Sequence, residues 1–452
     1  MSIHAIVLAA GQGTRMRSRL PKVLHELAGR PLLQHVLDGA RDAGVDALHV
    51  VIGYGGTRVR DAIADERLQW VEQPEQLGTG HAVMQALPAV PDDATVLVLY
   101  GDVPLVRPAT MRLLLAAATD GPALLSVFLS NPSGYGRILR APDGGLLGIV
   151  EHKDATPEQL DIRETNSGLL ACPAGILRSC LGRCSNDNAQ GEYYLTDVIG
   201  LAVADGLPVS AVVASDSTEV TGINDRVQLA AMERAYQRRQ AEDLMRAGVT
   251  VADPERIDVR GALSCGTDVF IDVNCVFEGR VRLAEGVRIG PNCLVRESDL
   301  GPNTVVEANS VLEQAVIGSG VQVGPFARLR PGTDLADNSK VGNFVEIKKA
   351  RLGEGSKANH LSYIGDASVG AGVNIGAGTI TCNYDGVNKH QTVIEDGAFI
   401  GSDTQLIAPV TVGRGAVIGA GTTVTRDVSP DSLATSRARQ SEVAGWRSRR
   451  RG

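Results

Sequence analysis

Aromatic residues are scarce in this chain of 452 residues, where phenylalanine, tryptophan and tyrosine together make up 4%. Uninterrupted apolar runs of about 18 residues are also missing, which argues against a membrane-spanning helix. The start of the chain, Met1-Ser-Ile-His4, has no charged segment followed by a hydrophobic core and so does not look like a secretory signal. These absences predict a cytoplasmic protein without membrane insertion.

Cysteine is too sparse for a disulfide-stabilised fold. The seven cysteines are an odd number, and the close pair Cys180 and Cys184 has no partner pair of cysteines or histidines at zinc spacing. The formal net charge is -8, from 44 basic against 52 acidic residues, which argues against a nucleic-acid partner. The locally basic tail at 446–452 is interpreted as a solvated terminus.

Glycine, in contrast, is abundant, with 52 residues, and the length allows two or three domains. Up to about residue 220, apolar strand-like runs such as 3–9 and 95–100 alternate with helical patterns, which predicts a Rossmann-like α/β domain with a mostly parallel sheet. A long helix is predicted to follow it, because Asn and Asp precede the helical stretch and Gly248 ends it. The predicted boundaries are 1–226, a helical linker at 227–247, and 248–452.

A six-residue repeat occupies the C-terminal part of the chain. An aliphatic residue recurs every six positions and is followed by Gly, Ala or an acidic residue, as in Ile289-Gly-Pro-Asn-Cys293 and Val323-Gly-Pro-Phe-Ala327. Sustained over about 150 residues, this pattern predicts a left-handed parallel β-helix in which three hexapeptides complete one coil. Such a fold accounts for both the excess of glycine at corners and the lack of aromatic residues inside.

The first predicted strand runs into a glycine-rich loop within residues 8–24. Gly11 and Gly13 let the backbone approach a phosphate, and Arg15 and Lys22 add positive charge where a phosphorus centre under attack becomes more negative. A plain structural turn is an equally good interpretation of Gly-x-Gly alone. The third glycine of a dinucleotide-binding fingerprint is missing, so that cofactor is not predicted.

The hexapeptide repeat also aligns charged residues. Arg330 and Lys348 both follow the aliphatic residue of their hexads, 18 positions apart, and are predicted to stack about 4.8 Å apart on one side of the β-helix. Two stacked cations repel each other unless an anion lies against them, and a phosphate is the natural candidate. His360 faces outward nearby, where a neutral imidazole can accept a proton; a solvated surface histidine is the alternative.

The loop at 8–24 closely resembles the signature of sugar-1-phosphate nucleotidyltransferases. With the hexapeptide half included, essentially the whole chain is similar to the bacterial family of bifunctional N-acetylglucosamine-1-phosphate uridyltransferases and glucosamine-1-phosphate N-acetyltransferases. Further stretches that agree with this family are 73–79, 100–102, 134–137, 149–153, 164–168, 191–197 and 222–225.

The resemblance implies two transferase reactions. Domain 248–452 would transfer acetyl from acetyl-CoA to glucosamine 1-phosphate. Domain 1–226 would transfer uridylyl from UTP to N-acetylglucosamine 1-phosphate, releasing pyrophosphate. The product, UDP-N-acetylglucosamine, would supply peptidoglycan and lipopolysaccharide precursors, including those of lipid A. The family is also homotrimeric, which implies acetyltransfer sites at chain interfaces.

The resemblance assigns roles in uridylyl transfer. Asp102 ends an apolar strand, where a carboxylate suits Mg2+ but where a helix N-cap is the alternative. The family pairs this aspartate with Asn224 as metal ligands and uses Arg15 and Lys22 as catalytic cations. Uracil is read by Gln73, Gly78 and Thr79, with backbone groups of Ala10 and Gly11, and the sugar with its acetamido group by Gly136, Glu151 and Asn166. The full implied set of UTP and UDP-N-acetylglucosamine contacts is Leu8, Ala9, Ala10, Gly11, Lys22, Gln73, Gly78, Thr79, Tyr100, Gly101, Asp102, Gly136, Glu151, Asn166 and Asn224.

For acetyl transfer, the resemblance makes His360 the general base. Segment 380–392 interrupts the hexapeptide phase, which marks either a functional loop or a neutral insertion. Within it, Cys382 raises the alternative of an acyl-cysteine intermediate, although direct transfer to the amine needs none. The implied glucosamine-1-phosphate contacts are Arg330, Lys348, Tyr363 and Asn374, and the implied acetyl-CoA contacts are Ala377, Asn383, Tyr384, Ser402, Ala420 and Arg437.

Two other functions stay open at the level of sequence. The β-helix can serve only oligomerisation or allostery, as in nucleotidyltransferases that resemble ADP-glucose synthases; the outward group Arg330, Lys348 and His360 argues against this. The chain can also be a scaffold that senses a sugar nucleotide without catalysis. The presence of Lys22, Asp102 and Asn224 argues against that alternative.

Overall fold

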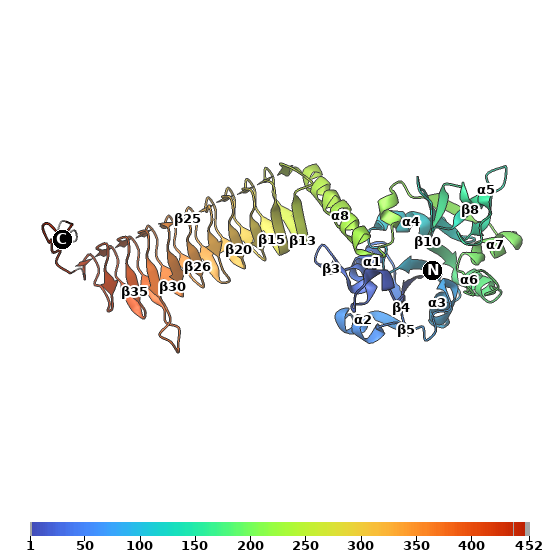
Figure 1. Ribbon diagram of the computed structural model, residues 1–452, viewed down its shortest axis with the longest axis horizontal. Coiled ribbons are helices and arrows are strands. Elements are labelled where there is room, and N and C mark those ends of the chain that lie inside the picture. The colour runs from blue at the N-terminus through green and yellow to red at the C-terminus, as the bar shows by residue number, and fades with distance from the viewer. Residues whose placement is uncertain (1, 437, 448–452) are drawn as a thin grey trace. The chain divides into compact units, whose positions relative to one another are not determined.

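The chain folds into two compact units, which the computed structural model describes over residues 2–436 and 438–447. The division falls between Tyr236 and Gln237, within helix α8 (Arg226–Arg246). Each unit has its own hydrophobic core. Figure 1 shows the course of the chain through its helices and strands. Among the described residues, no helix is both long enough and apolar enough to span a membrane.

A nine-stranded, mostly parallel sheet forms the centre of the N-terminal unit. Its main path runs β11-β7-β10-β6-β1-β4-β5, and only β10 among these strands runs antiparallel to its neighbours. This confirms the predicted α/β domain. The strands are β1 (Ile3–Ala9), β4 (Ala47–Ile52), β5 (Leu68–Glu72), β6 (Thr95–Tyr100), β7 (Ala123–Phe128), β8 (Arg137–Arg140), β9 (Leu146–Val150), β10 (Glu164–Pro173) and β11 (Ser210–Val213), with a separate hairpin of β2 (Glu26–Leu27) and β3 (Arg30–Pro31).

Helices cover both faces of this sheet, because alternate residues of each strand point to opposite sides. From β1, Ala5 and Val7 pack in a core with α1 (Leu32–Asp42), α2 (Gly56–Ala62) and α4 (Pro108–Ala116). Ile6 packs in a second core with α3 (Thr79–Ala86), α6 (Ala174–Leu181) and α7 (Asp197–Ala204). The remaining short elements are α5 (Pro157–Leu160), η1 (Thr14–Met16), η2 (Lys22–Leu24), η3 (Leu87–Ala89) and η4 (Ser217–Val220).

The strand order determines where a ligand can bind. Strand β1 pairs with β4 on one side and with β6 on the other, so the direction of winding reverses between β1 and β6. Ligands of open α/β sheets bind at such a switch point, beyond the carboxyl ends of the strands. Leu8 lies opposite Tyr100 at that edge. The predicted loops at 8–11 and 100–102 are therefore brought together.

The C-terminal unit is a parallel β-helix, as predicted from the hexapeptide repeat. Its strands form two sheets that follow the stacked coils (Figure 1). One contains β12 (Thr250–Val251), β14 (Phe270–Ile271), β16 (Arg288–Ile289), β19 (Val305–Val306), β22 (Gln322–Val323), β25 (Lys340–Asn343), β28 (Lys357–His360), β31 (Asn374–Ile375), β34 (Phe399–Ile400), β37 (Val417–Ile418) and β39 (Leu433–Ala434). The other contains β13 (Ile257–Cys265), β15 (Cys275–Leu283), β17 (Leu294–Arg296), β18 (Asp299–Leu300), β20 (Val311–Glu313), β21 (Ala315–Ile317), β23 (Arg328–Leu329), β24 (Thr333–Leu335), β26 (Glu346–Lys348), β27 (Arg351–Leu352), β29 (Tyr363–Gly365), β30 (Ala367–Val369), β32 (Ile380–Cys382), β33 (Thr392–Ile394), β35 (Gln405–Ile407), β36 (Val410–Val412) and β38 (Thr423–Val424).

Aliphatic columns fill the interior of the coils. Val323 and Ala327, the first and fifth residues of one hexad, are both buried, as the repeat predicts. Val323 pairs with Val341, 18 positions later, whereas Val306 pairs with Val323, 17 positions later. A coil therefore takes 17 or 18 residues, and similar side chains stack from coil to coil.

One coil is longer than the others. Ala367 pairs with Thr392, 25 positions later, because the segment after β32 leaves the coil and returns before β33. An antiparallel bridge between Tyr384 and Lys389 closes this hairpin, which protrudes from the stack between β30 and β35 (Figure 1). The interruption predicted at 380–392 is therefore an extruded loop.

Two stacked histidines lie within the sheet of the N-terminal unit. His49 on β4 is completely buried, and its Nε2 lies 2.9 Å from Nδ1 of His4 on β1. The Nδ1 atom of His49 has no hydrogen-bond partner among the described residues. Burial, with a smaller contribution from His4, lowers the pKa of His49 to about 4.

We expect this pair to make the stability of the N-terminal unit depend on pH. The folded protein resists protonation of His49 until about pH 4, whereas an unfolded histidine takes up its proton near pH 6.5. The free energy of unfolding should therefore fall as the pH drops through that window. His49→Gln should show a shallower pH dependence than the parent chain in urea unfolding followed by Trp70 fluorescence, with Trp446→Phe in both proteins. Equal pH dependence of the two proteins would contradict this account.

Candidate functional site

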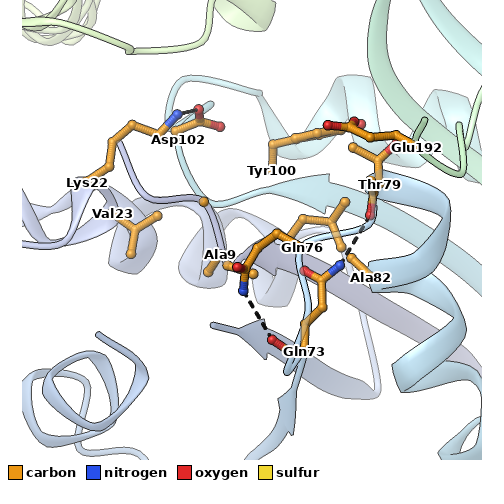
Figure 2. A pocket seen from close by; sticks show the side chains of 14 residues that line it. Ala9, Lys22, Val23, Gln73, Gln76, Thr79, Ala82, Tyr100, Asp102 and Glu192 are labelled. Atoms are coloured by element: carbon orange, nitrogen blue, oxygen red, sulfur yellow. Dashed lines mark hydrogen bonds and ion pairs between the residues drawn. The ribbon is translucent and has the colours of Figure 1, made fainter. Parts of the chain in front are cut away.

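A cleft of about 230 Å³ opens at the predicted edge of the sheet, beyond β1 and β6. Figure 2 shows Gln73 and Thr79 on one side of it and Lys22 with Asp102 on the other. The residues predicted to bind the nucleotide account for most of its lining. Those residues are Leu8, Ala9, Ala10, Gly11, Lys22, Gln73, Gly78, Thr79, Tyr100 and Asp102.

Glycine is needed at this cleft for two different reasons. Gly11 faces open space, which leaves room for a ligand to approach the backbone. Gly13 and Gly78 have φ angles of 63° and 105°. At these two positions a Cβ atom would lie 2.6 Å from Lys22 Cβ and 2.6 Å from the Tyr193 carbonyl oxygen, respectively. At these two positions the absence of a side chain is therefore already required by packing within the protein.

A cation and two oxygen ligands converge at the end of the cleft. The Lys22 ammonium forms an ion pair with Asp102 and donates a hydrogen bond of 3.2 Å to Asn224 Oδ1. Lys22 and Asp102 have side-chain exposures of only 14% and 16%, so water screens their attraction weakly. Asp102 and Asn224 thus both reach one cationic group although they are far apart in sequence.

The same oxygen pair suits Mg2+. A carboxylate and an amide oxygen are hard ligands, and Mg2+ commonly takes one or two protein ligands and fills its other positions with water and phosphate. No group of three or more His, Cys, Asp and Glu side chains forms a metal cage in the described part of the chain. The donor set therefore fits a cation shared with a phosphorylated substrate.

The three predicted sugar contacts also come together. The Asn166 backbone N–H donates to the Gly136 carbonyl at 2.9 Å, and a Cβ on Gly136 would lie 3.5 Å from Glu151. Thr196 donates its hydroxyl hydrogen to Glu151 Oε1 at 3.0 Å. Burial raises the pKa of Glu151, and the Thr196 hydrogen bond counteracts that rise.

Tyr100 connects the nucleotide and sugar parts. It lines both the cleft and the small adjoining hollow that contains Asn166 and Thr196. Burial raises the pKa of its phenol, with Glu151 and Asp102 adding to the rise. The phenol is thus uncharged, and it lies between the regions of Asp102 and Glu151.

Some predicted residues lie outside the lining, and some lining residues were missed. Arg15 is exposed on η1, and Gly101 supports the cleft from behind, where a Cβ would lie 3.1 Å from Val23. Gln76 and Glu192 fall within the family motifs at 73–79 and 191–197. These motifs could therefore have identified both residues. The lining residues absent from the predicted set are Val23, Gln76, Ala82 and Glu192.

On the β-helix, an alternating column of charges leads to the second predicted site. Arg260, Glu278, Arg296 and Glu313 stack on successive coils. Glu278 accepts from Arg260 at 3.1 Å and from Arg296 at 2.7 Å, and Arg296 donates to Glu313 at 2.7 Å. Arg296 therefore lies between two acidic neighbours, and Arg260 contacts one of them.

The alternation ends at Arg330 and Lys348. These residues follow the paired residues Leu329 and Ile347, which confirms the predicted stacking of the two cations. Each cation has a carboxylate within the chain: Glu346 accepts from Arg330 at 2.8 Å, and Asp366 lies 3.7 Å from the Lys348 ammonium. Anions therefore do lie against the two cations, as expected, but these anions are carboxylates of the chain itself, and phosphate binding stays a prediction.

The extruded loop adds a third cation that the sequence did not single out. Lys389 contacts the Lys348 side chain, and this contact with its neighbouring charge lowers the pKa of Lys389. Asp366 and Tyr363 partly offset the effect. Positive charge thus remains in excess where the hairpin folds back onto the coils.

His360 lies at a corner of the β-helix with an oriented imidazole. Its Nδ1 is 2.7 Å from Asn343 Oδ1 on the preceding coil, so Nδ1–H donates and Nε2 keeps its lone pair. Sequence reasoning missed Asn343, which contacts the imidazole. Extending the strand register by two residues beyond Ala358, Ile375, Ile400 and Ile418 places Ala377, Ser402 and Ala420 at the same corner as His360 on the following coils.

The other predicted residues of this site fall into separate groups. Tyr363 begins the next side of the coil, opposite Glu346, and Asn374 lies beside Lys357 at the other end of β28 from His360. Asn383 donates to Asp366, and Tyr384 is exposed on the hairpin. Arg437 lies outside the described residues.

Cys382 is a poor candidate for a covalent carrier. Burial raises the pKa of its thiol, which disfavours the thiolate that would attack a thioester. The burial of this thiol therefore argues against the acyl-cysteine alternative.

Two protein families match separate parts of the chain. The MobA-like NTP transferase domain matches residues 5–158, which contain every lining residue of the cleft except Glu192. The bacterial transferase hexapeptide family matches residues 314–349 and 391–426 in the β-helix.

Curated relatives that carry the description "Bifunctional protein GlmU" match nearly the whole chain. The protein of Alkalilimnicola ehrlichii is 61% identical over 99% of this chain and 96% of its own length. That of Marinobacter nauticus is 58% identical over 98% of both chains. That of Bordetella parapertussis is 57% identical, again over 98% of both chains.

Removing the Thr196 hydroxyl should raise the pKa of Glu151 further, because the hydrogen bond that favours its ionised form is lost. We expect Thr196→Val to shift the Glu151 carboxyl titration upward in 13C NMR spectra. Thr221→Val is the matched control, since Thr221 donates to the Ser217 carbonyl instead. A Glu151 titration that stays unchanged in Thr196→Val would show that the hydroxyl does not hold this carboxylate.

Proposed function

The chain belongs to the bifunctional GlmU family, and from this premise we propose a division of labour between its two units. The protein is a bifunctional transferase that makes UDP-N-acetylglucosamine by acetylating glucosamine 1-phosphate and then transferring a uridylyl group to the product. Residues 1–226 serve uridylyl transfer, 227–247 form a helical linker, and 248–452 serve acetyl transfer. The observation that carries the proposal is the presence of two separate groups of cations and polar side chains, one in each unit.

Uridylyl transfer is an in-line attack by a phosphate oxygen of N-acetylglucosamine 1-phosphate on the α-phosphorus of UTP. The P–O bond to pyrophosphate breaks as the new one forms, so catalysis depends on positioning and charge neutralisation. Lys22 and Arg15 neutralise phosphate charge, and Gln73 with Gly78 and Thr79 binds uracil. The sugar is held by Gly136, Glu151 and Asn166, with Tyr100 as the wall between the two substrates.

The residues present fit a Mg2+ requirement. Asp102 and Asn224 would hold the ion, and Lys22, which bonds to both in this structure, would be freed toward the phosphates. When bound, Mg2+ neutralises charge on the phosphate oxygens. The chain itself contributes the low exposure that keeps these charge interactions strong.

Acetyl transfer uses the outward surface of the β-helix. Arg330 and Lys348 bind the phosphate of glucosamine 1-phosphate, with Tyr363 and Asn374 on the sugar. His360 Nε2 takes the proton from the amine as its nitrogen attacks the thioester carbon of acetyl-CoA, and the coenzyme A sulfur leaves. The coenzyme contacts are Ala377, Asn383, Tyr384, Ser402, Ala420 and Arg437.

A homotrimer with acetyltransfer sites between chains completes the proposal. Phe326 and Phe344, with exposures of 49% and 56%, stack on adjacent coils with ring centroids 5.2 Å apart, and Leu361 beside His360 is 62% exposed. All three have positive φ, which bulky residues adopt only at a cost. An exposed apolar strip of this kind supports burial against a neighbouring chain.

The place of the enzyme in the cell follows from its substrates. UTP, acetyl-CoA and sugar phosphates are cytoplasmic metabolites, and we assign the protein to that compartment. Its product supplies precursors of peptidoglycan and lipopolysaccharide.

Substitutions in the two sites should separate the two activities. We expect His360→Ala to lower acetyl transfer by about 10²- to 10⁴-fold, because a positioned base is lost, and to leave uridylyl transfer intact. Asp102→Asn should lower uridylyl transfer by at least about 100-fold and spare acetyl transfer. Coupled assays of each half-reaction on the full-length variants measure both effects.

Removing divalent metal from the parent protein with EDTA should have the same effect as Asp102→Asn: uridylyl transfer falls and acetyl transfer is spared. Circular dichroism verifies that each variant is folded. Loss of both activities in one folded variant, or acetyl transfer that needs Mg2+, would contradict the assignment of two independent sites.

A further inference from the structure

The Gln73 amide has a defined orientation at the edge of the cleft. Gln73 is 4% exposed, and its Nε2 lies 3.3 Å from the Gly78 carbonyl oxygen and 3.1 Å from His81 Nδ1. Figure 2 shows this nitrogen directed toward the Thr79 side and the amide oxygen on the opposite side, near Gln76. Within the described chain, no hydrogen bond is donated to Gln73 Oε1. The oxygen is therefore the end of the amide that is available to a ligand.

The Gly78 carbonyl and His81 impose this orientation together. If the amide were turned over, its oxygen would face the Gly78 carbonyl oxygen at 3.3 Å, two acceptors without a shared hydrogen. With the nitrogen in place, its second hydrogen points to His81 Nδ1, which must then carry a lone pair. A neutral His81 therefore has its proton on Nε2.

The far side of His81 agrees with this tautomer once the Gln85 amide is turned over. Gln85, one helical turn later on α3, has its amide nitrogen placed 3.1 Å from His81 Nε2. A neutral imidazole carries a proton on one ring nitrogen, so its two nitrogens cannot both accept hydrogen bonds. One of the two amides therefore presents its oxygen to His81. Gln85 is that residue, because it is only half-buried and its alternative acceptor, the His81 carbonyl, lies 3.5 Å away, at the limit of a hydrogen bond.

We propose that His81 is a specificity-determining residue that makes Gln73 select uracil over cytosine, through the chain Gln85, His81, Gln73. Uracil presents a single N–H on its ring edge, at N3, where cytosine has a lone pair. The Gln73 amide oxygen accepts from the first and repels the second. His81 does not touch the base; it holds the amide so that its oxygen faces the base.

This inference rests on the proposed uridylyl transfer and on Gln73 as a base contact. Its consequence is a change in selectivity, whereas a merely structural role for His81 would lower the rates with all nucleotides alike. In His81→Leu the Gln73 amide nitrogen loses one of its two acceptors and keeps only the long contact to the Gly78 carbonyl, so the amide is held less firmly and turns over more readily. In His81→Asn the oxygen of the introduced side chain can take the place of His81 Nδ1 and restore the contact to Gln73 Nε2.

The experiment compares kcat/KM for UTP and CTP in the full-length protein and these two variants. We expect the UTP-to-CTP ratio to fall at least about tenfold in His81→Leu and to stay within about threefold of the parent value in His81→Asn. An unchanged ratio in a folded His81→Leu variant would overturn the proposal.

A second measurement does not depend on catalysis or on the stability of His81→Leu. Long-range 1H–15N NMR spectra of the 15N-histidine-labelled parent protein distinguish the two imidazole tautomers, and the signal missing from His81→Asn identifies His81 among the 8 histidines. We expect a proton on Nε2 and none on Nδ1. A proton on Nδ1 overturns the inference, whereas an Nε2–H tautomer in a protein that fails to use UTP overturns the proposed function alone.

Discussion

Parallel strand pairing is the constraint on which both sites depend. In the N-terminal unit, parallel strands end at one edge of the sheet and bring the loop after β1 beside the loop after β6. In the β-helix, parallel pairing stacks residues 17 or 18 positions apart on successive coils. One rule of backbone hydrogen bonding therefore converts distant positions into neighbours in two unrelated folds. The polar residues at those positions then determine the chemistry.

Charge placement follows the same rule on the β-helix. From Arg260 to Arg330 each cation alternates with an acidic residue, and the resulting ion pairs need no ligand. Lys348 occurs where the next acidic residue would continue the pattern, and Lys389 reaches back to the same point from the extruded loop. Along the β-helix, a column in which basic and acidic side chains neutralise each other thus gives way to a region with more positive than negative charge. A phosphate would take up that surplus.

Much of this arrangement could be predicted from the sequence because it depends on periodicity and on motifs at strand ends. The stacking of Arg330 and Lys348 follows directly from the repeat, and the glycine-rich loop and Asp102 follow from strands whose carboxyl ends share an edge. These are properties of the backbone.

The contacts that sequence reasoning missed are between side chains. The Glu346 and Asp366 partners, the return of Lys389 and the Asn343 bond to His360 depend on where the ends of side chains lie. Lys389 in particular lies in an insertion that lengthens one coil to 25 residues, where the repeat gives no register. The Thr196 bond to Glu151 and the orientation of the Gln73 amide likewise follow from no repeat in the sequence.

Lys348→Glu would continue the alternation of basic and acidic residues along the β-helix by one more coil. Calorimetry then measures whether this variant binds glucosamine 1-phosphate. Lys340→Glu, on another side of the same coil, controls for the change in net charge. We expect Lys348→Glu to stay folded, to transfer uridylyl groups normally and to lose binding of the sugar phosphate, whereas Lys340→Glu should still bind it. Wild-type affinity in Lys348→Glu would contradict the claim that the interrupted charge column forms the anion site.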